Sequence, residues 1–158
     1  METFKIWKTL TIDQYEDSVA ILNNLASRGI KVGDWAKQSL KRSSSRFVHY
    51  PKTLQLVTIT VAELGHSNGV LTSDLYASAL SKGLTLCEPH MAPYIRLAYL
   101  EQPAMESLYV AMNSITGDEN FDSRYRIVNA VDKDLWLTGD HRHLDDRWLA
   151  TDLLVFEL

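Results

Sequence analysis

The fold is decided by the run Ser107-Leu108-Tyr109-Val110-Ala111-Met112 and by the segments that follow it. Leu108, Val110 and Met112 share one face of an extended chain, and Tyr109 and Ala111 take the other. Shorter runs of the same character follow, separated by turns, at residues 124–131, 135–137 and 153–158. Several short strands joined by turns predict a mostly antiparallel β-meander in the carboxyl-terminal part of the chain.

Two earlier segments also have strand character. Residues 94–100 are predicted as a strand, joined to the strand at 107–115 by a hairpin over 101–106. The run from Leu54 to Val61 alternates and is rich in β-branched residues, so we expect a strand with both faces partly covered.

Three segments in the first half of the chain predict helices. Thr11-Ile12-Asp13-Gln14 has the form of a capping box, so the first helix is expected over 12–28, with Gly29 as its stop. The second is expected from Asp34 to about Arg42, and the third from Thr72 or Ser73 to Gly83. The fold class is therefore α+β, with N-terminal helices packed on one side of a mostly antiparallel C-terminal β-meander, in one globular domain over 1–158.

Composition narrows the class of protein. The chain has 158 residues, of which 46% are hydrophobic and 23% charged, which excludes disordered and collagen-like architectures. Its one cysteine, Cys87, cannot form an internal disulfide, and no apolar run approaches the roughly 20 residues of a membrane span. Residues 1–8 lack the apolar stretch of a secretory signal. We expect a soluble, cytoplasmic protein that does not contact a membrane.

Several different short segments, spread over most of the chain, together form a recognisable pattern. It comprises 4–9, 33–36, Gly83-Leu84-Thr85-Leu86-Cys87-Glu88-Pro89, the run from Ala92 to Pro103, and Val110-Ala111-Met112. In these segments the chain resembles a family of small uncharacterised bacterial proteins. The resemblance implies one compact bacterial domain and assigns no activity, ligand or functional residue. The chain departs from the family pattern at Ala104-Met105, where a glycine-containing turn is expected.

Charge is divided between two regions. The net charge is −4, but residues 31–52 carry six basic side chains against one acid, and residues 101–158 carry twelve acids against five bases. Cations beside aromatic rings can hold phosphates and stack bases, so the basic segment 37–52 is a candidate nucleic-acid-binding segment. Its candidate contacts are Lys37, Lys41, Arg42, Arg46 and Lys52. The alternative is a solvated basic loop, which the pI of about 5.7 favours because nucleic-acid domains usually exceed about 9.

A candidate metal site lies in the stretch Asp140-His141-Arg142-His143-Leu144-Asp145-Asp146. In an extended chain, His141, His143 and Asp145 fall on one face, and two imidazoles with a carboxylate are a ligand set of iron and zinc enzymes. The alternative is a polar loop before the last strand. Cys87 and His90 could supply two more ligands, or Cys87 a nucleophile, but Cys87 between apolar residues is typical of a buried structural thiol.

Standard catalytic signatures are missing from the sequence. It contains no Gly-x-Gly-x-x-Gly, no Walker loop, no His-Glu-x-x-His and no Gly-x-Ser-x-Gly. The four tryptophans and seven tyrosines suit a contact surface, where aromatic residues are enriched. We therefore expect a non-enzymatic protein, without a cofactor, that binds a protein partner or a second copy of itself. Nucleic-acid binding and a metal-dependent enzyme remain the alternative hypotheses.

Overall fold

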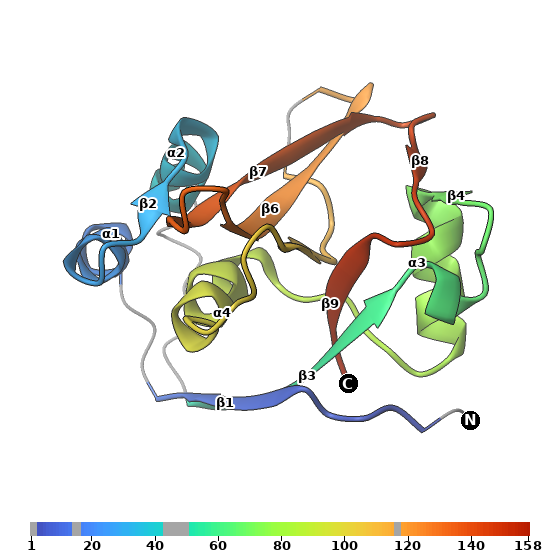
Figure 1. Cartoon of the computed structure of the whole chain (residues 1–158), viewed down its shortest axis with the longest axis horizontal. Helices are drawn as coiled ribbons and strands as arrows, with labels where there is room; N and C mark the ends of the chain where they lie inside the picture. The colour runs from blue at the N-terminus through green and yellow to red at the C-terminus, as the bar shows by residue number, and fades with distance from the viewer. Residues whose placement is uncertain (1–2, 14–16, 43–50, 116–117) are drawn as a thin grey trace.

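The computed structural model describes residues 3–13, 17–42, 51–115 and 118–158. It shows a mixed α and β protein with a large, mostly antiparallel sheet, as the sequence predicts (Figure 1). The sheet has seven strands in the order β1-β3-β9-β5-β6-β7-β2. Their bounds are β1 Lys8–Ile12, β2 Lys31–Val32, β3 Lys52–Thr60, β5 Ser107–Val110, β6 Phe121–Asn129, β7 Leu135–His143 and β9 Leu153–Glu157. A separate two-stranded sheet pairs β4 (Val70–Leu71) with β8 (Arg147–Trp148).

The meander is confirmed only for part of the carboxyl-terminal half. β5, β6 and β7 are antiparallel neighbours in chain order. The last strand does not continue outward from β7, as a meander would require. Instead β9 lies between β3 and β5, antiparallel to β3 and parallel to β5. This central place suits its sequence, because Leu154, Val155 and Phe156 are fully buried and need cover on both faces of the sheet.

Helices cover both faces of the sheet, which corrects the expectation that they share one side. The helices are α1 (Ser18–Ser27), α2 (Asp34–Arg42), α3 (Thr72–Ser81) and α4 (Ala92–Ala98), with short 3-10 turns at η2 (Ala62–Leu64) and η3 (Pro89–Met91). α1, α2 and α4 contribute to one core with Leu56 and Val155, whereas α3 contributes to a second core with Val57 and Phe156. Figure 1 shows α3 across the sheet from the other three. Strand alternation sends neighbouring residues into different cores.

The first predicted helix starts too early. Thr11 belongs to β1, where it pairs with Thr53, and Gln14 lies outside the described residues. The N-cap of α1 is Asp17, whose carboxylate accepts a hydrogen bond from the Ala20 amide at 2.8 Å. The expected stop is confirmed, since Gly29 takes a left-handed φ of 71°. The sequence has the form of a capping box followed by apolar residues, but pairing with β3 makes Thr11 and Ile12 part of a strand.

The predicted strand at 94–100 is wrong, because this segment forms α4. Pro93 occupies the first turn of the helix, where its missing N–H is not needed. The side chain of Arg96 is fully buried and donates hydrogen bonds to groups near the ends of neighbouring elements. It donates to Gln102 Oε1 at 2.7 Å and to the backbone oxygens of Tyr99, Val128 and Trp136 at 2.5, 3.1 and 3.2 Å. Arg96 therefore forms a junction that ties α4 to β6 and β7.

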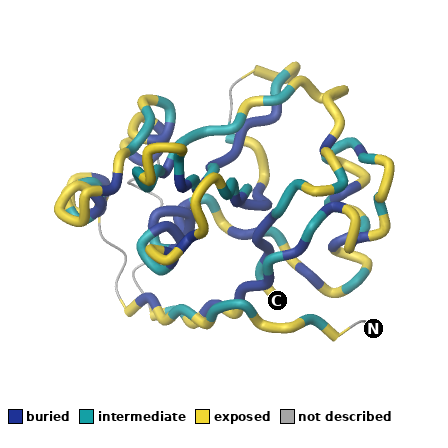
Figure 2. The backbone as a smooth tube through the Cα atoms, in the orientation of Figure 1, coloured by how far each residue is buried: buried dark blue, intermediate teal, exposed yellow. Residues whose placement is uncertain are grey.

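Burial in Figure 2 is densest along the central strands and α4, and the outer side of α1 is exposed. Within the described ranges, no helix has both the length and the apolar character needed to span a membrane.

The buried side chain of His90, in η3, makes folding sensitive to acid. Burial lowers the pKa of His90 below its usual 6.5, and Lys52 adds to this effect while Glu88 opposes it. The unfolded chain therefore binds more protons than the folded one as the pH falls below 6.5, so the free energy of unfolding should fall there. In urea titrations from pH 7.5 to 5, His90→Gln should flatten this part of the profile. Glu88→Gln should steepen it, and an unchanged slope in both variants would contradict the assignment.

Candidate functional site

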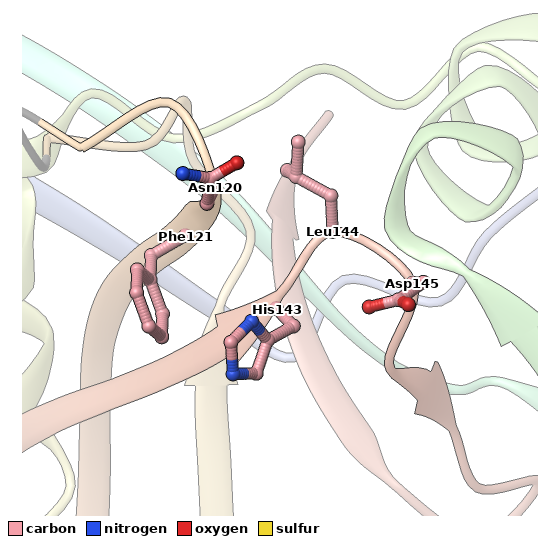
Figure 3. Close-up of a pocket in the computed structure, with 5 residues that line it drawn as sticks. All are labelled: Asn120, Phe121, His143, Leu144 and Asp145. Carbon is pink, nitrogen blue, oxygen red and sulfur yellow. The ribbon is translucent and has the colours of Figure 1, made fainter.

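The three residues of the predicted metal site do not form a ligand cluster. His141 Nδ1 lies 2.8 Å from Ser123 Oγ, and the ring of His141 packs edge-on against Trp35 at 4.9 Å between centroids. The ring of His143 packs on Phe121 at 4.4 Å. Figure 3 shows His143 beside Phe121 and Asp145 beyond Leu144, around a surface hollow of about 460 Å³.

Each imidazole therefore has a cross-strand partner. Register explains these contacts, because Ser123 pairs with His141 and Phe121 with His143 across β6 and β7. Across the described part of the chain, no group of three His, Cys, Asp or Glu side chains is arranged to hold a metal ion. The metal site thus remains a prediction from spacing.

Cys87 is buried beneath the sheet. Its thiol lies 3.7 Å from the carbonyl oxygen of Val155, and burial raises its pKa far above the usual value for cysteine. A thiol that resists ionisation is a poor nucleophile and a poor metal ligand. The structure therefore favours the structural role for Cys87.

The candidate nucleic-acid contacts are divided between two elements. Lys37, Lys41 and Arg42 are exposed on α2. Lys52, at the start of β3, lies 3.6 Å from carboxylate oxygens of both Glu88 and Glu157. Arg46 lies outside the described residues, as do the nearby aromatic residues of 43–50. Lys52 thus has acidic partners, whereas Lys37, Lys41 and Arg42 lie on a different element, α2.

An open strand edge is the first feature that sequence reasoning missed. β1 pairs with β3 and has no second neighbour among the described residues. Alternate residues of an edge strand turn their N–H and C=O groups outward, ready to pair with another chain. A hollow of about 300 Å³ runs beside β1, against α4 and the end of α1. Its lining comprises Thr9, Leu10, Thr11, Ile12, Arg28, Tyr94, Leu97 and Ala98.

The lining of the hollow is largely apolar and includes one cation, Arg28. Leu10, Tyr94 and Leu97 are only partly buried, and they pack against the core that α1, α2 and α4 share. Arg28 is exposed, and its Nε donates to Asn24 Oδ1 at 3.3 Å. Among the described residues, no acidic side chain forms an ion pair with Arg28. As far as the described residues extend, the hollow therefore offers a ligand a positive charge that has no acidic partner.

A buried network of charges lies on the opposite face of the sheet, beside α3. Arg124 on β6 is fully buried, forms an ion pair with Asp122, and donates from Nε to Asp140 at 3.3 Å. Its Nη1 donates to the phenolic oxygen of Tyr76 on α3 at 2.7 Å. Burial alone would lower the pKa of Arg124, but Tyr76, Asp122 and Asp140 outweigh burial and raise it.

Both arginines of this network pack on the ring of Trp148. The guanidinium carbon of Arg142 lies 3.7 Å from the centroid of the Trp148 ring, and that of Arg124 lies 4.9 Å away. Arg142 also donates from Nε to Asp140 at 2.8 Å. Desolvated cations on an indole face interact favourably. In the sequence, the charged residues within 122–126 and 140–142 recur at every second position. This alternation could have indicated a charged face of a strand, but it could not have indicated that the face is buried.

No family model, no curated protein and no solved structure matches this chain. The edge of β1 can form backbone hydrogen bonds with an extended chain and accept apolar side chains in the adjoining hollow. The network around Arg124 can fix the positions of hydrogen-bonding groups near α3, because its members hold one another in place.

Proposed function

We propose that the protein is a cytoplasmic, non-enzymatic binding protein whose β1 edge takes up an extended segment of a partner protein. The single observation that carries the proposal is the open edge of β1 beside an apolar hollow. An incoming strand would extend the sheet by backbone hydrogen bonds, and its alternate side chains would enter the hollow.

Backbone pairing would supply affinity, and the hollow would supply selectivity. A side chain of the segment that faces Leu10, Tyr94 and Leu97 should be apolar and of moderate size, since the hollow has a volume of about 300 Å³. Thr9 and Thr11 alternate with Leu10 along β1 and are exposed, although they also line the hollow. The segment should therefore alternate apolar side chains with polar ones.

Arg28 defines the charge of the segment. Because no described acidic residue neutralises Arg28, a carboxylate of the partner would gain an ion pair without breaking an existing one. The partner segment is therefore extended, alternating and acidic at one end. This charge complementarity favours a foreign segment over a second copy, because β1 itself carries Lys8 and no acid.

The test uses a dye-labelled peptide of seven residues that alternates valine and threonine and ends in aspartate. Fluorescence anisotropy should show saturable binding to the full chain. Methylation of alternate peptide nitrogens removes the hydrogen bonds that a strand edge needs, so the methylated peptide should bind at least about tenfold more weakly. Equal binding of both peptides would overturn strand addition.

A charge reversal tests the role of Arg28. Arg28→Glu should weaken the aspartate-ended peptide by about tenfold and favour a lysine-ended peptide. Arg42→Glu, an exposed change of the same charge on α2, is the matched control and should leave both affinities unchanged. Identical effects of the two variants would show general electrostatics only. A stable dimer by light scattering that neither peptide disrupts would identify a second copy as the occupant and overturn the proposal.

A further inference from the structure

A second cavity, away from the β1 edge, lies between α3, the end of β5 and the start of β6. Its volume is about 350 Å³, at the lower end of the range for small-molecule sites. Six of its eight lining residues have polar side chains, and the lining comprises Thr72, Ser73, Tyr76, Met112, Asn113, Ser114, Asp122 and Leu144. Two of these residues, Tyr76 and Asp122, belong to the buried network around Arg124.

Two hydroxyl groups of the lining act as hydrogen-bond donors. The phenolic oxygen of Tyr76 accepts from Arg124 Nη1 at 2.7 Å and from the Met112 amide at 3.3 Å, so both acceptor positions are used. The hydroxyl oxygen of Thr72 accepts from Trp148 Nε1 at 2.9 Å. Neither hydroxyl donates to a described residue. Their protons are therefore available to a molecule in the cavity.

Tyr76 keeps its proton at neutral pH. Burial is the largest influence on its phenol and raises the pKa above the usual 10, although Arg124 acts in the opposite direction. The phenol is thus a neutral donor fixed by two hydrogen bonds. Fixed donors lose little entropy when they bind a ligand.

The cavity also contains an acceptor but no net charge. One oxygen of the Asp122 carboxylate pairs with Arg124, and no described residue donates a hydrogen bond to the other. In the network at this side of the cavity, the two carboxylates Asp122 and Asp140 balance the two guanidinium groups Arg124 and Arg142. An anion would approach the Asp122 carboxylate, and a cation would find that carboxylate already neutralised. The ligand should therefore be neutral.

We infer that this cavity binds a neutral polyhydroxylated molecule of monosaccharide size. A hydroxyl group both accepts and donates, so adjacent hydroxyls of one ligand can accept from Tyr76 and Thr72 and donate to Asp122. Met112 and Leu144 give apolar surface for the C–H groups of the ring. The inference is independent of the proposed function, because the cavity and the β1 edge share no residue.

The test titrates the ¹⁵N-labelled full chain with D-glucose, D-galactose and D-mannose, each to about 10 mM, which detects millimolar affinities. At least one sugar should cause saturable shifts in the amide signals of residues 72–76 and 112–114. Methyl glycosides form a second arm: retained binding indicates a sugar at the end of a glycan, and lost binding a free sugar. No shift with any sugar, or larger shifts with glycine or inorganic phosphate at the same residues, would overturn the inference.

Variants locate the binding in the cavity. Tyr76→Phe keeps the ring and removes the donor, so affinity should fall about tenfold. Tyr94→Phe makes the same change in the hollow beside β1 and should have no effect. Leu144→Trp should abolish binding by filling the cavity from an exposed turn, so it stays informative if Tyr76→Phe fails to fold. Leu149→Trp, at another exposed leucine, is its matched control. If the Leu144→Trp variant still binds the sugar, the sugar binds outside this cavity and the inference is overturned.

Discussion

Replacing Arg96 by alanine should lower the free energy of unfolding by about 3–5 kcal/mol, a large part of the roughly 5–15 kcal/mol that stabilises an ordinary domain. The guanidinium of Arg96 donates four hydrogen bonds, and its removal leaves Gln102 Oε1 and three backbone oxygens without that donor. Each buried acceptor left unsatisfied costs about 1–3 kcal/mol. Urea denaturation followed by tryptophan fluorescence measures the loss.

Two further variants separate the guanidinium from its charge. Arg96→Lys keeps a cation but cannot reach all four acceptors, so it should recover only part of the lost stability. Arg147→Ala removes an exposed arginine that donates to the Gly69 oxygen at 3.0 Å, and its effect should stay below about 1 kcal/mol. Equal losses for Arg96→Ala and Arg147→Ala would refute the idea of a structural junction at Arg96.

The local sequence pattern predicted the structure correctly where an element is determined by which of its faces is buried. The helix at 34–42 has the predicted bounds, and the alternation of Leu108, Val110 and Met112 sends these side chains into one core, as expected. The strand expected over Leu54 to Val61 is present as Lys52–Thr60, and both of its faces are covered as predicted, each by a different core.

Pattern failed where distant contacts decide the structure. In α4, the neighbouring residues Ile95 and Arg96 are both buried. The order of apolar and polar residues in this segment therefore matches neither a surface helix nor a half-buried strand. The reason is the fully buried guanidinium, whose acceptors Val128 and Trp136 lie more than 30 residues away in the chain. The helix predicted over 12–28 wrongly included Ile12, the last residue of β1, because the pairing partner that makes this segment a strand begins at Lys52. Such partners have no local signal.

The candidate sites were even less accessible to sequence reasoning. The spacing of His141 and His143 correctly places both imidazoles on one face of a strand. However, Ser123, Phe121 and Trp35 supply their contacts. Trp35 reaches this face because residue 139 is glycine: a Cβ built there would lie 2.6 Å from Trp35 Cε3. The edge of β1 and the cavity beside Tyr76 depend on which elements become neighbours, and the strand order supplies that information.

Removing the buried charge of Arg124 should have the second large effect. Arg124→Met approximately keeps the volume of the side chain but leaves the carboxylate of Asp122, which is 7% exposed, without its cation. Breaking one partner of a buried ion pair typically costs about 3–5 kcal/mol. We expect a loss of this size at pH 7 by urea denaturation.

The dependence of this loss on pH identifies its cause. Near pH 4 a carboxylate without a cation can take up a proton, which removes the buried negative charge, so the deficit of Arg124→Met relative to the wild type should shrink. A deficit caused by lost packing against Trp148 would be the same at both pH values. The double variant Arg124→Met with Asp122→Asn should be more stable at pH 7 than Arg124→Met alone, because it removes the unpaired charge. If the double variant is no more stable, the network does not act through charge.

The same variants distinguish stability from binding. Burying two arginines and two aspartates brings little net stability compared with apolar residues of similar volume, because desolvation offsets most of the attraction. What the network does provide is a fixed orientation for the phenol of Tyr76 and one oxygen of Asp122 at the cavity. The double variant should therefore regain stability without regaining affinity for the sugar. Recovery of both together would mean that the network serves the fold alone.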